Sequence, residues 1–157
     1  MEYIVSLLVR NEVGVLSRVA NLFGKRGLNI NSISAGETEN PCVTRMTIRT
    51  EGNANAGDGV ISSLKKLRDV IKVVEYVHDK RIARELAFIK MENSDFSLSR
   101  EVVKSIHSFQ TKIVSMTDKD MIIEVVENEN KVDSLLQLLG QYRIKEVVRS
   151  GQIAISL

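Results

Sequence analysis

Polar and apolar residues follow an order along the chain that predicts two similar units. Alternation typical of strands falls at residues 2–9, 29–37, 43–50, 71–78, 83–91, 111–116, 121–127 and 144–148. Apolar positions at helical spacing lie between these strands, from residues 15, 59, 99 and 130 onward. Each unit thus has the order strand, helix, strand, strand, helix, strand. This order predicts an α+β fold of two consecutive ferredoxin-like βαββαβ domains with antiparallel sheets.

A charged junction, Asp79-Lys80-Arg81, separates the two units, so we predict domains at residues 1–78 and 79–157. Side chains that suit helix N-caps precede three of the helices, at Asp58, Ser99 and Asn130. Gly151 interrupts the last extended segment, where we expect a bulge or tight bend.

The stretch from Asn11 to Ile33 contains the first helix and the start of the next strand. Val15, Val19 and Leu22 recur at helical spacing and form an apolar face. Gly27 follows the last helical turn and can take the left-handed conformation that ends a helix.

The start of this helix is a candidate anion site. The first backbone N–H groups of a helix have no partner inside it, and Gly14 has no side chain to block them. Asn11 offers an amide to the same ligand. By themselves, Asn11 and Gly14 favour an ordinary cap and a tight turn, so a ligand needs further support.

The first strand is apolar on both faces. Ile4 and Leu8 point one way, whereas Val5, Leu7 and Val9 point the other. We expect helices to cover one face and something else to cover the second.

Composition and charge exclude several classes of protein. The chain has 22 basic and 20 acidic residues, without a dominant block of one sign, which argues against a nucleic-acid partner. The single cysteine suits a reducing cytoplasm, and no apolar run approaches membrane-spanning length. The start of the chain reads as a strand rather than a signal peptide. The histidines, His78 and His107, show no metal-ligand spacing, and no catalytic constellation is found.

The first unit resembles an ACT domain, the ferredoxin-like module that binds amino acids and regulates enzymes. More closely, it is similar to the regulatory small subunit of acetohydroxyacid synthase, also called acetolactate synthase. The residues that carry this likeness are Asn11 to Val19, Leu22-Phe23, Arg26-Gly27, Asn29-Ile30 and Arg45 to Ile48. In the second unit they are Arg84-Glu85-Leu86, Lys90, Lys131-Val132-Asp133, Glu146-Val147 and Arg149-Ser150-Gly151.

The resemblance implies a chain that regulates and does not catalyse. It implies a homodimer through the ACT domain, with valine at the interface. Asn29 and Ile30 of one chain would close a site opened by the other chain's Asn11, Gly14, Val15 and Leu16. The partner would be the catalytic large subunit, which would hold thiamine diphosphate, Mg and FAD. The chain itself would hold no cofactor or metal, would activate that partner and would confer valine feedback inhibition on branched-chain amino acid synthesis.

A protein of another class remains as the alternative. A free-standing ACT-type sensor would control a different protein or transcription. No helix-turn-helix is left over once the two units are assigned, which speaks against a transcription factor.

Overall fold

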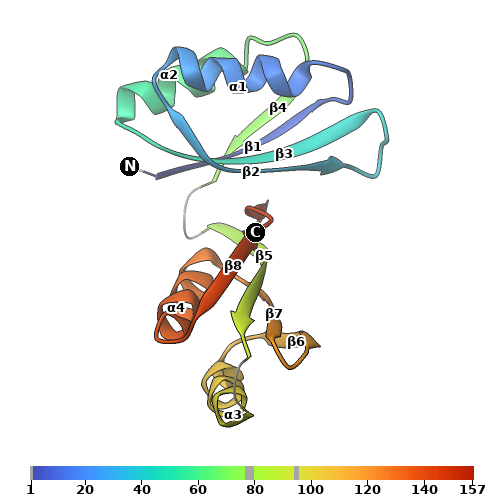
Figure 1. Ribbon diagram of the computed structural model, residues 1–157. Coiled ribbons are helices and arrows are strands. Elements are labelled where there is room, and N and C mark those ends of the chain that lie inside the picture. Colours follow the sequence, from blue (N-terminus) through green and yellow to red (C-terminus); the bar gives the residue numbers. More distant parts are fainter. Residues whose placement is uncertain (1, 77–79, 94–95) are drawn as a thin grey trace. The chain divides into compact units, whose positions relative to one another are not determined.

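The computed structural model describes residues 2–76, 80–93 and 96–157, and its two antiparallel sheets confirm the predicted fold class (Figure 1). The chain forms two compact units. One comprises Met1–Ile82 together with Gln152–Leu157, and the other comprises Ala83–Gly151. The chain therefore passes from the first unit to the second and returns for its last six residues.

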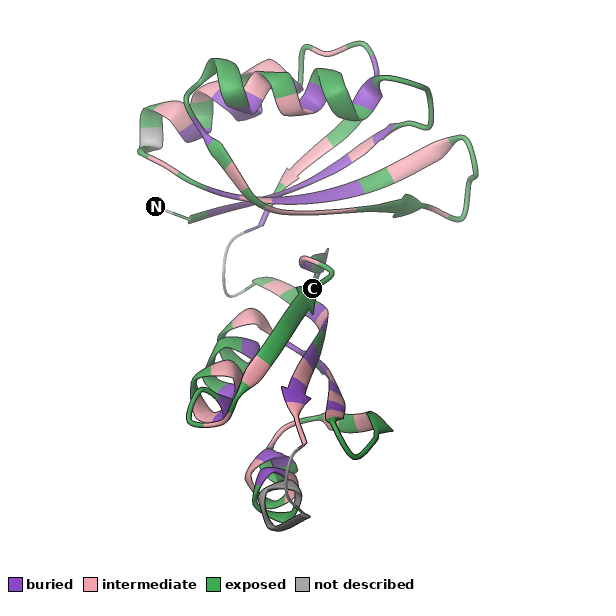
Figure 2. Ribbon diagram, viewed as in Figure 1, coloured by how far each residue is buried: buried purple, intermediate pink, exposed green. Residues whose placement is uncertain are grey.

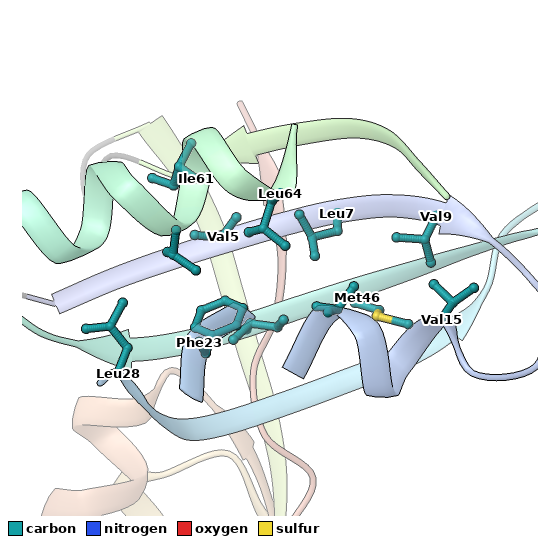
Figure 3. Close-up of a cluster of buried hydrophobic side chains, with 12 residues drawn as sticks. Val5, Leu7, Val9, Val15, Phe23, Leu28, Met46, Ile61 and Leu64 are labelled. Carbon is teal, nitrogen blue, oxygen red and sulfur yellow. The ribbon is translucent and has the colours of Figure 1, made fainter. Parts of the chain in front are cut away.

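The first unit is a four-stranded sheet with two helices on one face (Figure 1). Its strand order is β2-β3-β1-β4. The elements are β1 (Glu2–Arg10), α1 (Val15–Lys25), β2 (Asn29–Glu37), β3 (Val43–Glu51), α2 (Ala54–Leu64) and β4 (Val70–Glu75). Alternate residues of β1 and β3 face α1 and α2, and Figure 3 shows Phe23 and Met46 in this cluster. Phe23 is fully buried there.

The opposite face of this sheet is partly covered by the end of the chain. The hydroxyl of Tyr76 donates a hydrogen bond to the carbonyl of Ala154 (3.0 Å), and the N–H of Gln152 donates to Oγ of Ser32 (3.2 Å). The strand β9 (Ile153–Ser156) pairs with β5, and the N–H of Leu157 donates to the carbonyl of Lys80. Ile4 is buried on this face, which accounts for a first strand that is apolar on both sides.

The second unit repeats the plan, with strand order β6-β7-β5-β8. Its elements are β5 (Arg81–Glu92), α3 (Phe96–Ser105), the 3-10 turn η2 (Ile106–Ser108), β6 (Thr111–Met116), β7 (Asp120–Glu127), α4 (Glu129–Leu139) and β8 (Ile144–Arg149). The core lies between the helices and the inward residues of β5 and β7, among them Ile89 and Ile123. Figure 2 shows β8 exposed along most of its length.

An ionic cluster fixes one end of the second sheet. Glu85 and Glu127 lie directly opposite each other on β5 and β7, and both are buried. Arg149 pairs with Glu85 and, at 2.7 Å, with Asp133, while Lys131 pairs with Glu127 at 3.0 Å. Burial lowers the pKa of Arg149, but the hydrogen bonds to Glu85 and Asp133 outweigh it and hold the pKa above its ordinary value.

Three predicted helix starts are wrong by two to five residues. The side chain of Asn53 caps α2 by accepting from the N–H of Ala56, so Asp58 lies inside that helix. Asn128, rather than Asn130, caps α4 through the N–H of Lys131. The helix α3 begins at Phe96, so Ser99 is internal. In α2 and α4, an asparagine that comes earlier in the chain than the predicted residue serves as the N-cap.

Other features of the turns follow the sequence more closely. Gly27 and Gly151 both have positive φ, of 67° and 77°. The strand predicted at residues 71–78 corresponds to β4, which ends at Glu75; residues 77 and 78 lie outside the described residues. Among the helices of the described ranges, none is long and apolar enough to cross a membrane.

Candidate functional site

The turn between β1 and α1 opens the helix start through Gly14. This residue has φ 84° and ψ −4°, in the left-handed region, and supplies no side-chain cap. The N–H of Val15 bonds to Glu12, and that of Arg18 bonds to the carbonyl of Gly14. Between them, the N–H groups of Leu16 and Ser17 have no hydrogen-bond partner among the described residues. These two donors, at the positive end of the helix, are suited to bind a carboxylate.

Arg18 lies over this opening. A methyl group on Gly14 would sit 3.0 Å from Nη1 of Arg18, so the guanidinium approaches the glycine closely. Nε of Arg18 donates to Oδ2 of Asp69 at 2.7 Å, which holds the side chain in place. Asp69 is buried, whereas Arg18 is half-exposed. The helix start is therefore flanked by a fixed cation that faces solvent.

Asn11 lies beside the opening but its amide nitrogen is already used. Nδ2 donates to Oε1 of Glu37 (3.2 Å) and to the carbonyl of Pro41 (2.9 Å). These bonds tie the helix start to the β2–β3 turn. The interpretation of Asn11 as an amide donor to the ligand therefore changes: its oxygen, a hydrogen-bond acceptor, is the atom that stays available.

The two apolar residues predicted at the helix start point in different directions. The side chain of Val15 is 2% exposed and packs into the core. Leu16 is 49% exposed and Val13 is fully exposed. Only Leu16 and Val13 can therefore offer an apolar surface to a ligand at this end of the helix.

Asn29 and Ile30 lie at the other end of the same unit. Asn29 is paired with Glu51, and Glu51 is paired with Glu2, at the start of β1. Asn11 instead follows directly on Arg10, at the end of β1. The intervening helix has 11 residues and is about 16 Å long at 1.5 Å per residue. Within one chain, the structure brings Asn11, Gly14 and Leu16 together and keeps Asn29 and Ile30 apart from them.

Sequence reasoning did not assign a role to Arg18 or Asp69. A signal for Arg18 was present, since a residue four positions after Gly14 lies on the same helix face. Asp69 could not be found in this way, because its proximity comes from the fold: its carbonyl accepts from the N–H of Arg10 at the end of the neighbouring strand.

No group of three or more His, Cys, Asp or Glu residues that could hold a metal ion occurs in the described ranges. Cys42 is a free, exposed thiol. The helix start itself offers backbone donors and a guanidinium, groups that suit a small anion or zwitterion.

Comparisons with known proteins cover both units. Residues 5–72 match the family model described as "AHAS small subunit-like ACT domain", and residues 84–157 match "Small subunit of acetolactate synthase". A probable acetolactate synthase small subunit of Archaeoglobus fulgidus is 39% identical over 154 residues, which are 98% of this chain and 96% of that protein. The acetolactate synthase small subunit of Mycolicibacterium smegmatis is 35% identical over 96% of this chain and 88% of its own.

A solved structure agrees in fold over the full length. The acetolactate synthase small subunit of Thermotoga maritima superimposes with a TM-score of 0.89 at 33% sequence identity, covering 100% of this chain and 98% of that one. Matches of this identity and coverage, in both units, confirm the resemblance drawn from the sequence motifs. The chain belongs to the family of acetolactate synthase small subunits, the regulatory rather than the catalytic subunits of that enzyme.

Proposed function

We propose that this chain activates the catalytic large subunit of acetolactate synthase and makes it sensitive to valine. The proposal places valine sensing in the ACT domain, residues 1–78, and assigns part of the activation to residues 79–157. Thiamine diphosphate, Mg and FAD belong, in this proposal, to the large subunit. The complex would work in the cytoplasm, where an exposed free thiol such as Cys42 stays reduced.

The observation that carries the proposal is the open start of α1. The N–H groups of Leu16 and Ser17 and the guanidinium of Arg18 would bind the valine carboxylate. The oxygen of Asn11 would accept from the ammonium group, and the exposed side chain of Leu16 would contact the isopropyl group. Carboxylate, ammonium and apolar chain are the three features that distinguish valine from inorganic anions.

The separation of Asn29 and Ile30 supports a site shared between two copies. The strand β2 is at the edge of its sheet, so it can pair with β2 of a second copy. Antiparallel pairing about Ile33 would set Asn29 of one copy opposite Glu37 of the other. Because Glu37 accepts from Asn11, the second copy's Asn29 and Ile30 would then lie beside the helix start. A two-fold dimer would contain two such sites.

The test is acetolactate formation by the large subunit mixed with this chain, with and without valine. We expect Leu16→Asp to abolish valine inhibition, because its carboxylate occupies the positive helix end that the ligand needs. Asn21→Asp is the matched control, since Asn21 is an exposed residue of the same helix beyond the site. Full valine inhibition with Leu16→Asp, or loss of it with Asn21→Asp, would contradict the proposal.

A further inference from the structure

The second unit exposes an apolar surface on the sheet face that the helices leave uncovered. Inward residues of β5 and β7, such as Ile89 and Ile123, pack under α3 and α4, so their neighbours in the strands point the other way. On that outer face, Phe88 is 38% exposed, Val114 42% and Val148 52%. We call this surface, made by Phe88, Lys90, Val114, Ile122, Glu124, Glu146 and Val148, the outer face of the second unit.

This outer face is hollowed. A depression of about 400 Å³ is lined by Phe88, Lys90, Val114, Ile122, Glu146 and Val148. Four of these six residues are apolar, whereas a sheet face in contact with water usually carries polar residues. The apolar residues of this depression adjoin one another across four strands, exposed on β5, β6 and β8 and half-buried on β7. They form a patch of the kind that marks an interaction site.

The charges on the outer face have a regular arrangement. Phe88 is directly opposite Glu124 on β7, and Lys90, two residues along β5, is directly opposite Ile122. These four residues form a square, with Phe88 and Ile122 on one diagonal and Lys90 and Glu124 on the other. Glu124 makes no ion pair with any described residue, and the nearest carboxylate oxygen to Lys90 is 3.8 Å away, on Asp120.

We propose that the outer face binds the same face of a second copy of this chain. In a face-to-face contact whose two-fold axis follows the diagonal through Phe88 and Ile122, each of these residues meets its own equivalent. The same rotation sets Lys90 of each copy against Glu124 of the other. One square therefore supplies an apolar centre and two opposite-charge pairs, which is what an isologous interface requires.

The surrounding charges favour a second copy over an unrelated partner. Lys112 lies opposite Glu124 on the β6 side of the square, and Glu146 lies opposite Lys90 on the β8 side. Together with Lys112 at its β6 edge, the outer face thus carries two cations and two anions. A surface that attracts a partner of one charge would be expected to carry mainly the opposite charge. The signs are balanced, and the diagonal exchanges Lys90 with Glu124, which fits self-association.

The experiment is sedimentation velocity of the full-length chain over a range of concentrations. We expect Phe88→Asp to halve the mass of the largest species, because the substitution puts two carboxylates into the apolar centre. A tetramer becomes a dimer if β2 joins a further pair of copies, and a dimer becomes a monomer if β2 joins none. If β2 and the outer face join the same two copies, the dimer remains and its dissociation constant rises instead. Lys104→Glu, on the exposed side of α3, is the matched control and should leave the mass unchanged.

Charge reversal tests the pairing directly. Lys90→Glu or Glu124→Lys alone should weaken self-association by tenfold or more, since each creates two like-charge contacts per interface. A mixture of the two single variants should associate again, because each copy then supplies the charge that the other needs. A charge pair within one chain would not respond to mixing. A Phe88→Asp chain whose mass and dissociation constant are both unchanged, or a mixture that associates no better than its components, would overturn the proposal.

Discussion

The two units share one strand and helix order but treat the helix-free face of their sheets differently. In the first unit, residues 152–157 return to that face and bury Ala154 against it. In the second unit, no segment of the described chain plays this part for Phe88 and Val148, which stay exposed. The βαββαβ plan thus leaves one sheet face open, which the end of the chain partly covers in the first unit and no described segment covers at Phe88 and Val148 in the second.

The units also differ after their first strand. The first unit turns through Gly14, whose left-handed backbone leaves the helix start open. The corresponding stretch of the second unit reads Asn93-Ser94-Asp95-Phe96 and contains no glycine. A ligand site at a helix start is therefore proposed only for the first unit, and self-association through an open sheet face only for the second.

Removing a core side chain should produce the largest effect and should act on one unit alone. Phe23 is fully buried in the core of the first unit. Phe23→Ala should lower the free energy of unfolding of that unit by about 3–5 kcal/mol. Hydrogen exchange resolved by residue should be faster in β1 and β3 than in the unmodified chain, and unchanged in β5 and β7. Equal acceleration in both units would mean that they unfold as one.

Breaking the ionic cluster should destabilise the second unit only. Arg149→Met leaves the buried carboxylates of Glu85 and Glu127 opposite each other with one cation fewer. We expect the free energy of unfolding to fall by about 2–4 kcal/mol. This is less than the largest losses known for fully buried pairs, because Arg149 is partly exposed. Arg149→Lys should recover part of it, since one ammonium cannot reproduce the fork of bonds to Glu85 and Asp133. Denaturant titration measures both; a harmless Arg149→Met would contradict this role.

Truncation after Gly151 should destabilise the first unit although it removes the end of the chain. The loss exposes the face that Gln152 and Ala154 cover and removes the bond from the Tyr76 hydroxyl. Tyr76→Phe isolates that bond and should cost about 0.5–1.5 kcal/mol. Thermal unfolding followed in each unit should show a larger effect for the truncation than for Tyr76→Phe. A truncation that destabilised only the second unit would refute the assignment of residues 152–157.

A surface ion pair should give the smallest effect, visible in its pH dependence. The hydrogen bond from Lys145 (2.6 Å) lowers the pKa of Asp120 below its ordinary value of 3.8. Stabilisation by the ionised Asp120 is complete well above 3.8 and disappears as the pH falls through the lowered pKa. Lys145→Met should therefore be less stable than the unmodified chain at pH 6, with the gap closing below about pH 4. Lys104→Met should show no such gap.

Sequence patterns predicted the fold because they report burial, and burial follows strand and helix periods closely. Gly14 was recognised as an open helix start, but its left-handed φ was not, because a glycine is compatible with either conformation. With a helical φ at this position, a Gly14→Asp chain would keep its stability. With φ 84° we now expect a loss of about 1–2 kcal/mol from the strained backbone.

Contacts between distant segments were not predictable in the same way. The bonds of Asn11 to Glu37 and Pro41, and the cover that Gln152 gives to Ser32, join residues 26, 30 and 120 positions apart. Local pattern carries no information on such pairs. The site predicted at Asn11 and Gly14 stays a prediction, and the structure adds the guanidinium of Arg18 to the groups at this helix start.

The most direct test of the central claim, that valine binds at the start of α1, is calorimetric titration of valine into the full-length chain. The account predicts binding that Gly14→Asp weakens between tenfold and several hundredfold, because the new carboxylate takes the place of the ligand's. Gly27→Ala is the matched control: Gly27 also has positive φ, of 67°, and no atom lies within 4 Å of an added methyl group. It should carry similar backbone strain and bind valine normally. Unchanged valine binding by Gly14→Asp, or equal loss in both variants, would contradict the account.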